Sequence, residues 1–92
     1  MEFLVRTELT SPLPEDSIER EALLARERAV GVELKRRGII SHIWRVPGRQ
    51  ANIAVMDVAD ATELHDVLTS LPLWPYTTVT VEPLAVHPLT AS

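Results

Sequence analysis

The chain has 92 residues, so we expect a single domain over residues 1–92. Its net charge is −4, and it has no cysteine, which excludes disulfides, thiolate metal sites and thiol chemistry. Its nine Lys and Arg residues are spread among thirteen acids, whereas a nucleic-acid partner requires a clustered basic face. No apolar run approaches the roughly 20 residues that cross a bilayer, and no basic segment precedes a long apolar one near the start, so we expect a soluble, cytoplasmic protein without membrane contact.

The hydrophobic content is high for so short a chain. A small domain buries a lower fraction of its surface than a large one, yet 46 % of these residues are hydrophobic. We therefore expect some apolar surface to meet another subunit of a homo-oligomer.

The first half of the chain predicts a strand, a helix and a second strand. Residues 2–9 alternate between two faces, as in a strand, and the prolines at 12 and 14 interrupt the pattern. Asp16, with Glu19 three residues later, resembles a capping box and predicts a long helix over residues 16–37. Gly38 ends this helix, and residues 39–46 form a strand rich in β-branched side chains.

The second half predicts the remaining elements. A turn over residues 47–50 and an alternating strand over residues 51–58 complete a hairpin. A second capping signature, Asp60 with Glu63, begins an amphipathic helix that the prolines at 72 and 75 cannot continue. A last strand covers residues 76–82, and residues 83–92 form an extended C-terminal tail.

This order of elements predicts an α+β fold of ferredoxin-like type. The order βαββαβ corresponds to a four-stranded antiparallel sheet with two helices covering one face. The other face of the sheet also needs a cover, and an identical subunit is the simplest one.

Glu27 is the most informative acid in the sequence. It falls beside Leu23, Val30 and Leu34 on an apolar stripe of the first helix, and no basic residue lies one turn away. Gly31, one turn later, costs about 1 kcal/mol relative to alanine and therefore suggests a need for room. Such a carboxylate is suited to be a general base whose pKa is raised by desolvation. The structural alternative is that Glu27 pairs with an arginine from a strand or from a second chain.

The strand over residues 39–46 looks buried on both faces. His42 and Trp44 share one face of this strand, and Arg45 lies on the other. A single histidine in such a strand is more often a core residue with its hydrogen bonds formed than a catalytic acid, a catalytic base or a metal ligand. A buried Arg45 would need an anionic or carbonyl partner, which Glu27, an acid of another chain or a substrate carboxylate would supply. Arg49, at the hairpin tip, is by default a solvated turn residue.

Several kinds of chemistry lack a signal. The histidines at 42, 65 and 87 have no metal-ligand spacing, so we expect no metal site. The sequence also has no Gly-rich phosphate loop and no Gly-x-Ser-x-Gly turn.

Taken together, the segments resemble the muconolactone Δ-isomerase family over nearly the whole chain. The matching residues are 37–38, His42, 44–45, Gly48, 51–52, Val55, 57–58, 64–66, Leu68, 71–73, 75–76 and 87–88. The Leu-His-Asp run and the Leu-Pro-Leu-x-Pro-Tyr run at a fixed separation are the most specific part of the match.

The resemblance implies a ferredoxin-like subunit of a large homo-oligomeric ring, for which ten subunits is a candidate size, with pockets where subunits meet. It implies conversion of muconolactone to the enol-lactone of 3-oxoadipate in bacterial catechol degradation, without metal, nicotinamide, flavin or other cofactor. Glu27 matches the family's helix glutamate and would carry the proton. Arg45 and His42 would hold the substrate acetate and the dienolate oxygen, Asn52 would be a further donor, and Trp44 would help to exclude water.

The sequence departs from the family at the hairpin tip, and this leaves alternatives open. Arg49-Gln50 stands where relatives carry His-Tyr, so Arg49 becomes a candidate substrate-binding residue and dehalogenation of a chloromuconolactone becomes an alternative activity. A non-catalytic ferredoxin-like dimer that binds a small aromatic or lactone ligand is an alternative of another class. A heme- and flavin-independent monooxygenase of the dimeric α+β barrel type is a third.

Overall fold

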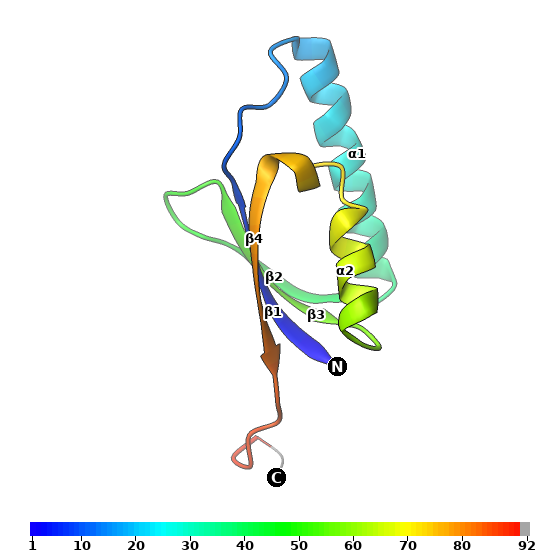
Figure 1. Cartoon of the computed structure of the whole chain (residues 1–92), viewed down its shortest axis with the longest axis vertical. Coiled ribbons are helices and arrows are strands. Elements are labelled where there is room, and N and C mark those ends of the chain that lie inside the picture. Colours follow the sequence, from blue (N-terminus) through cyan, green and yellow to red (C-terminus); the bar gives the residue numbers. More distant parts are fainter. Residues whose placement is uncertain (91–92) are drawn as a thin grey trace.

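The computed structural model describes residues 1–90 (Figure 1). The four strands form one antiparallel sheet in the order β2-β3-β1-β4. This arrangement confirms the predicted ferredoxin-like βαββαβ fold. The elements, in chain order, are β1 (Glu2–Leu9), α1 (Ser17–Arg36), β2 (Ile40–Arg45), β3 (Ala51–Asp57), α2 (Ala61–Thr69), a 3-10 helix η1 (Trp74–Tyr76) and β4 (Thr77–Leu84).

Both α-helices begin at the residues that the capping signals indicated. The Asp16 carboxylate accepts hydrogen bonds from the backbone N–H groups of Ile18 and Glu19, at 2.8 and 3.2 Å. Asp60 accepts one from the backbone N–H of Glu63 at 2.8 Å. These bonds satisfy donors that the first turn of a helix leaves unpaired. Gly38, just past the end of α1, has a φ of 77°, a backbone conformation that glycine adopts without steric cost.

The two helices pack on the same side of the sheet (Figure 1). A continuous core joins the helix-facing side chains of the strands to those of the helices, and burying each large apolar side chain contributes about 1.5–3 kcal/mol. The strand residues of this core are Phe3, Val5, Ile40, Ala54 and Met56, and the helix residues are Leu34, Leu64, Val67 and Leu68.

Strand β2 differs from the prediction that both of its faces are buried. Its register with β3 shifts between Ile40 and His42, so that Ile40 pairs with Met56 but His42 pairs with Val55. Such an irregularity moves the following side chains to the opposite faces. Residues 42–45 are exposed in the single chain, because β2 is an edge strand whose second half extends beyond the core.

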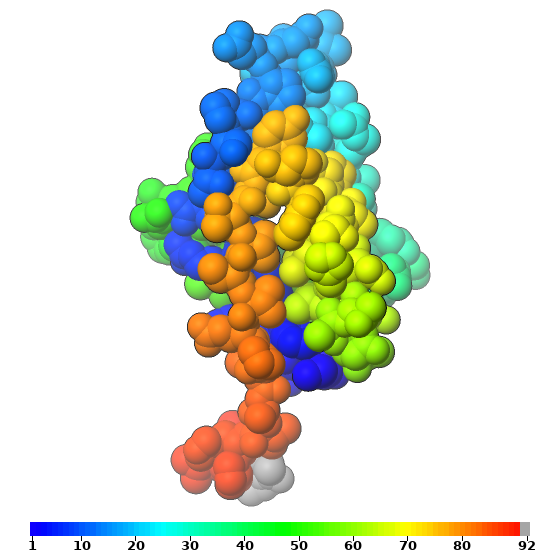
Figure 2. Space-filling view, viewed as in Figure 1, coloured from blue at the N-terminus to red at the C-terminus, as the bar shows by residue number. Residues whose placement is uncertain are grey.

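The last strand begins one residue later and ends two residues later than predicted. Pro83 and Leu84, which were assigned to the tail, still pair with β1. Proline is tolerated here because β4 is an edge strand, where one N–H per pair of residues points away from the sheet. Residues 85–90 then project beyond the body of the molecule (Figure 2). Within residues 1–90, no helix is long and apolar enough to cross a membrane.

Candidate active site

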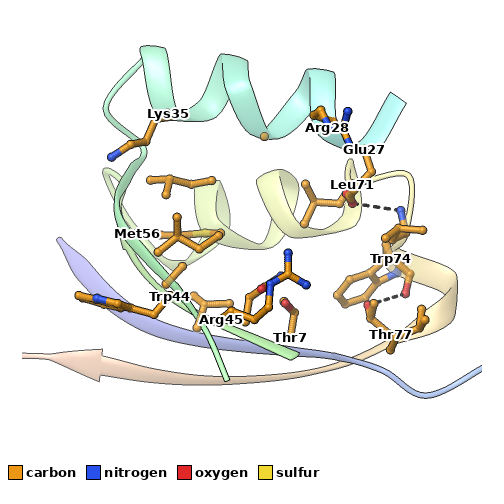
Figure 3. Close-up of a pocket in the computed structure, with 18 of the residues that line it drawn as sticks. Thr7, Glu27, Arg28, Lys35, Trp44, Arg45, Met56, Leu71, Trp74 and Thr77 are labelled. Atoms are coloured by element: carbon orange, nitrogen blue, oxygen red, sulfur yellow. Dashed lines mark hydrogen bonds between the residues drawn. The ribbon is translucent and has the colours of Figure 1, made fainter. Parts of the chain in front are cut away.

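A cavity of about 690 Å³ lies between α1 and the helix-facing side of the sheet (Figure 3). The segment after α2, which contains η1, lies at one end of it. The charged residues along its walls are Arg28, Lys35, Arg45 and a single acid, Glu27. In a protein with a net charge of −4, this local excess of cations favours an anionic ligand.

Glu27 extends from α1 into this cavity and is half-buried. Its Oε1 accepts a hydrogen bond from the backbone N–H of Leu73 at 3.2 Å. Burial raises the pKa of the Glu27 carboxyl group, and the smaller effect of the Leu73 hydrogen bond opposes that rise. The carboxylate is therefore held by one oxygen in an environment that makes it a better proton acceptor than an exposed glutamate.

No arginine of residues 1–90 pairs with Glu27. The ion pairs of this part of the chain involve other acids, namely Glu8, Glu33 and Asp57. The alternative that Glu27 pairs with an arginine from a strand of the same chain is therefore wrong for residues 1–90. Pairing with an arginine of a second chain stays a prediction.

Three polar side chains form a row across the floor of the cavity. Arg45 pairs with Asn52 in the register of β2 and β3, and Asn52 pairs with Thr7 in the register of β3 and β1. All three line the cavity. We call Arg45, Asn52 and Thr7 the polar row.

Arg45 was expected to be buried with an anionic or carbonyl partner, but it is exposed in the single chain. An acid of another chain or a substrate carboxylate as its partner stays a prediction. The Arg45 side chain points from β2 toward α1 (Figure 3). Within residues 1–90 its guanidinium makes neither an ion pair nor a hydrogen bond. Such a group presents a planar set of donors that can bind a carboxylate with two parallel hydrogen bonds.

Beside the polar row, the cavity is apolar. The adjacent row of the sheet consists of Ile43, Ala54 and Val5, and Gly31 faces the cavity from α1. A Cβ atom added to Gly31 would meet no atom within 4 Å. The space beside Gly31 is therefore open, and a need for room as the reason for this glycine stays a prediction.

The remaining predicted site residues lie at or beyond the edge of the cavity. Trp44 borders it from the edge strand, far along the sheet from Glu27 (Figure 3), and its ring stacks on that of His42 with centroids 5.5 Å apart. His42 itself does not line the cavity. Arg49 pairs with Glu8 instead, through Nε at 3.2 Å and through NH2. The single chain therefore gathers Glu27, Arg45 and Asn52, and roles for His42 and Arg49 in substrate binding stay predictions.

Sequence reasoning missed residues that the tertiary structure brings into the cavity. The sequence indicates Trp74 only as part of a proline-rich break, yet Trp74 lines the cavity. Gln50, which departs from the family at the hairpin tip together with Arg49, lines the cavity as well. Thr7 carried a detectable signal, since it is a polar residue on the strand face that also carries Phe3 and Val5. Within residues 1–90, no group of three or more His, Asp or Glu side chains is placed to hold a metal ion.

The scaffold and the cavity define a small ferredoxin-like protein in which a half-buried carboxylate of raised pKa and a guanidinium without a partner in residues 1–90 line one cavity. A family model described as muconolactone delta-isomerase matches residues 1–90. The chain belongs to the muconolactone delta-isomerase family.

Similar proteins agree with this assignment over nearly the full length. The muconolactone delta-isomerase 2 of Acinetobacter lwoffii is 45 % identical, covering 92 % of this chain and 91 % of that protein. The muconolactone delta-isomerase of Rhodococcus opacus is 40 % identical with the same coverage. A crystal structure of muconolactone isomerase superposes with a TM-score of 0.91 at 36 % identity, covering 100 % of this chain and 96 % of the other.

Proposed function

We propose that this chain converts muconolactone to the enol-lactone of 3-oxoadipate, with Glu27 as the group that carries the proton. The observation that supports this proposal is the geometry of Glu27. It is half-buried, anchored through one oxygen by the Leu73 N–H, and unpaired with any cation of residues 1–90. Family membership supplies the substrate class.

The reaction is a 1,3-proton shift in which no atom is gained or lost. The Glu27 carboxylate takes the proton from the ring carbon that bears the acetate arm. The electron pair of that C–H bond spreads through the ring double bond to the lactone carbonyl, which gives a dienolate. Glu27 then returns the proton to the ring carbon next to the carbonyl, and the double bond ends between the other two carbons. A single carboxylate can perform both transfers because it is regenerated in the second step.

The polar row supplies the other requirements of this chemistry. The Arg45 guanidinium binds the acetate carboxylate, and Asn52 donates a hydrogen bond to the lactone oxygen where negative charge develops. Apolar neighbours of Glu27, among them Leu71, Leu73 and Trp74, exclude water and raise the pKa of the base.

The protein is also proposed to be a homo-oligomer, because the sheet face opposite the helices carries partly buried or exposed apolar side chains. Leu4, Ile53 and Val55 lie on this face beside the stacked rings of His42 and Trp44. An identical subunit covers such a face by a symmetric contact. Light scattering should report a mass well above the 10.3 kDa of one chain, and a monomer at micromolar concentration would contradict the proposal.

The proposed activity is tested by offering muconolactone to the purified protein and identifying the product by NMR. We expect the enol-lactone to form with turnover, whereas a binding protein would show saturation without a product. The 5-chloro derivative should be offered in parallel with a chloride assay. Chloride release that is faster than isomerisation of the plain lactone would replace the isomerase by a dehalogenase.

A further inference from the structure

Thr7 is the member of the polar row to which no role has been assigned. It lies on β1, directly opposite Asn52 of β3, and Asn52 lies opposite Arg45 of β2. Neighbouring strands are about 4.8 Å apart, so the row spans about 10 Å from the backbone of Arg45 to that of Thr7. Figure 3 shows Thr7 and Arg45 pointing from the sheet into the same cavity, below Glu27 and beside Trp74.

The surroundings of Thr7 are mostly apolar. The same face of β1 carries Phe3 and Val5, which are buried, and Leu9, which is half-buried. The Thr7 hydroxyl is accessible from the cavity, because within residues 1–90 no buried side-chain oxygen or nitrogen lacks a hydrogen-bond partner.

The Thr7 hydroxyl has no hydrogen-bond partner within residues 1–90, although other threonine hydroxyls of the chain do. Thr10 bonds to Thr78, Thr69 to the carbonyl of His65, and Thr77 to the carbonyl of Trp74. An unpartnered, half-buried donor in the cavity wall is available to a bound molecule.

We propose that the Thr7 hydroxyl binds the lactone carbonyl oxygen of the substrate together with Asn52. This inference rests on the proposed isomerase function. The carbonyl and the acetate arm of muconolactone lie on opposite sides of the ring oxygen, so the two ends of the molecule match the two ends of the polar row. With the acetate on Arg45, the carbonyl lies toward Thr7, and the ring lies below Glu27.

Thr7 then acts on the reaction as well as on binding. Negative charge collects on the carbonyl oxygen when Glu27 removes the ring proton, and a donor already aimed at that oxygen stabilises the dienolate more than the neutral lactone. Loss of the hydroxyl should therefore lower kcat more than it raises KM.

The test replaces Thr7 by valine, which keeps the β-branched shape and removes only the hydroxyl. We expect Thr7→Val to lower kcat by about tenfold or more with a smaller change in KM, and Thr7→Ser to retain most of the activity. The control is Thr62→Val on α2, because Thr62 is exposed, does not line the cavity and does not lie on the sheet face proposed to contact another subunit. This variant should resemble the wild type, and circular dichroism and Tm should show that all three variants fold.

Two inhibitors show whether Thr7→Val acts by removing a contact with the substrate carbonyl or by changing the shape of the cavity. The saturated lactone acetate keeps the carbonyl, and its tetrahydrofuran counterpart lacks it. Thr7→Val should raise the inhibition constant of the first several-fold, up to about tenfold, and leave that of the second unchanged. Equal effects on both inhibitors, or wild-type kcat and KM in Thr7→Val, would overturn the inference. If the wild-type protein turns over muconolactone, such a result removes only the role of Thr7; if the wild type is inactive, the proposed function itself fails.

Discussion

The carboxylate of Glu27 and the backbone of Leu73 are joined by a hydrogen bond of 3.2 Å, although they are 46 positions apart in the sequence. The bond connects the middle of α1 to the turn between α2 and η1, which is shaped by prolines 72 and 75. It engages only Oε1 of Glu27. The remaining oxygen is available to a substrate in the cavity, and the orientation of the carboxylate is determined by a backbone N–H that is lost only if Leu73 is replaced by proline.

Replacing Glu27 by glutamine should abolish most of the proton shift and leave the fold intact. Glutamine keeps an oxygen that can accept the Leu73 hydrogen bond but cannot act as a base. We expect kcat to fall by roughly 10²- to 10⁴-fold, which corresponds to about 3 to 5 kcal/mol of barrier. Stability should change little, because within residues 1–90 no cation is left without its partner.

The matched control for this change is Glu33→Gln on the same helix, where the carboxylate is exposed and pairs with Arg36. Its kcat should equal that of the wild type. A stable Glu27→Gln variant with near-normal kcat would remove Glu27 from the mechanism and leave His42 as the next base to test.

The activity should fall in acid at a higher pH than an ordinary glutamate would cause. Burial raises the pKa of Glu27, and only the deprotonated form can accept the substrate proton. The acidic limb of kcat/KM against pH should therefore lie above the usual range of a glutamate. The profile of the residual activity of Glu27→Gln should lack this limb; a limb that persists unchanged would assign it to another group.

The raised pKa of Glu27 also predicts how the free energy of unfolding changes with pH. Between the ordinary pKa of Glu27 and its raised value in the folded chain, the native state binds more protons than the unfolded state. The free energy of unfolding should therefore decrease as pH rises through this window. Urea denaturation at a series of pH values should show that the wild type loses stability relative to Glu27→Gln across the window. A constant difference would contradict the raised pKa.

The open space beside Gly31 can be tested by substitutions of increasing size. Gly31→Ala should stabilise α1 by up to about 1 kcal/mol, because alanine favours a helix and its Cβ meets no atom within 4 Å. Gly31→Leu should fill part of the cavity and lower kcat/KM for muconolactone while the protein stays folded. Tm and kcat/KM of both variants measure the two effects, and full activity of Gly31→Leu would place the substrate elsewhere in the cavity.

The two residues of the hairpin tip should have separate effects on substrate choice. Gln50 lines the cavity, whereas Arg49 pairs with Glu8 outside it. Gln50→Tyr should therefore change the ratio of kcat/KM between the plain and the chlorinated lactone, and Arg49→His should leave that ratio nearly unchanged. The opposite outcome would mean that Arg49 reaches the substrate, for example across a subunit contact.

The sequence by itself determined the order of the elements and singled out Glu27 as the candidate base. Asp16, Asp60 and Gly38 act on neighbouring backbone groups, so their effects can be predicted without knowledge of the fold. The position of Glu27 on an apolar stripe is likewise a property of helical periodicity. Resemblance to the family then supplied the reaction, because the matching runs extend over most of the chain.

Only the tertiary structure decided what surrounds the base. The register shift in β2 turns Arg45 toward the cavity and His42 away from it, and a pattern of alternation cannot reveal such a shift. Thr7 meets Asn52 and Arg45 only because three strands pair in one register, and Trp74 reaches the cavity only because a turn folds back beneath α1. These contacts join residues far apart in the chain, and they depend on how the helices and strands pack, which no local pattern records.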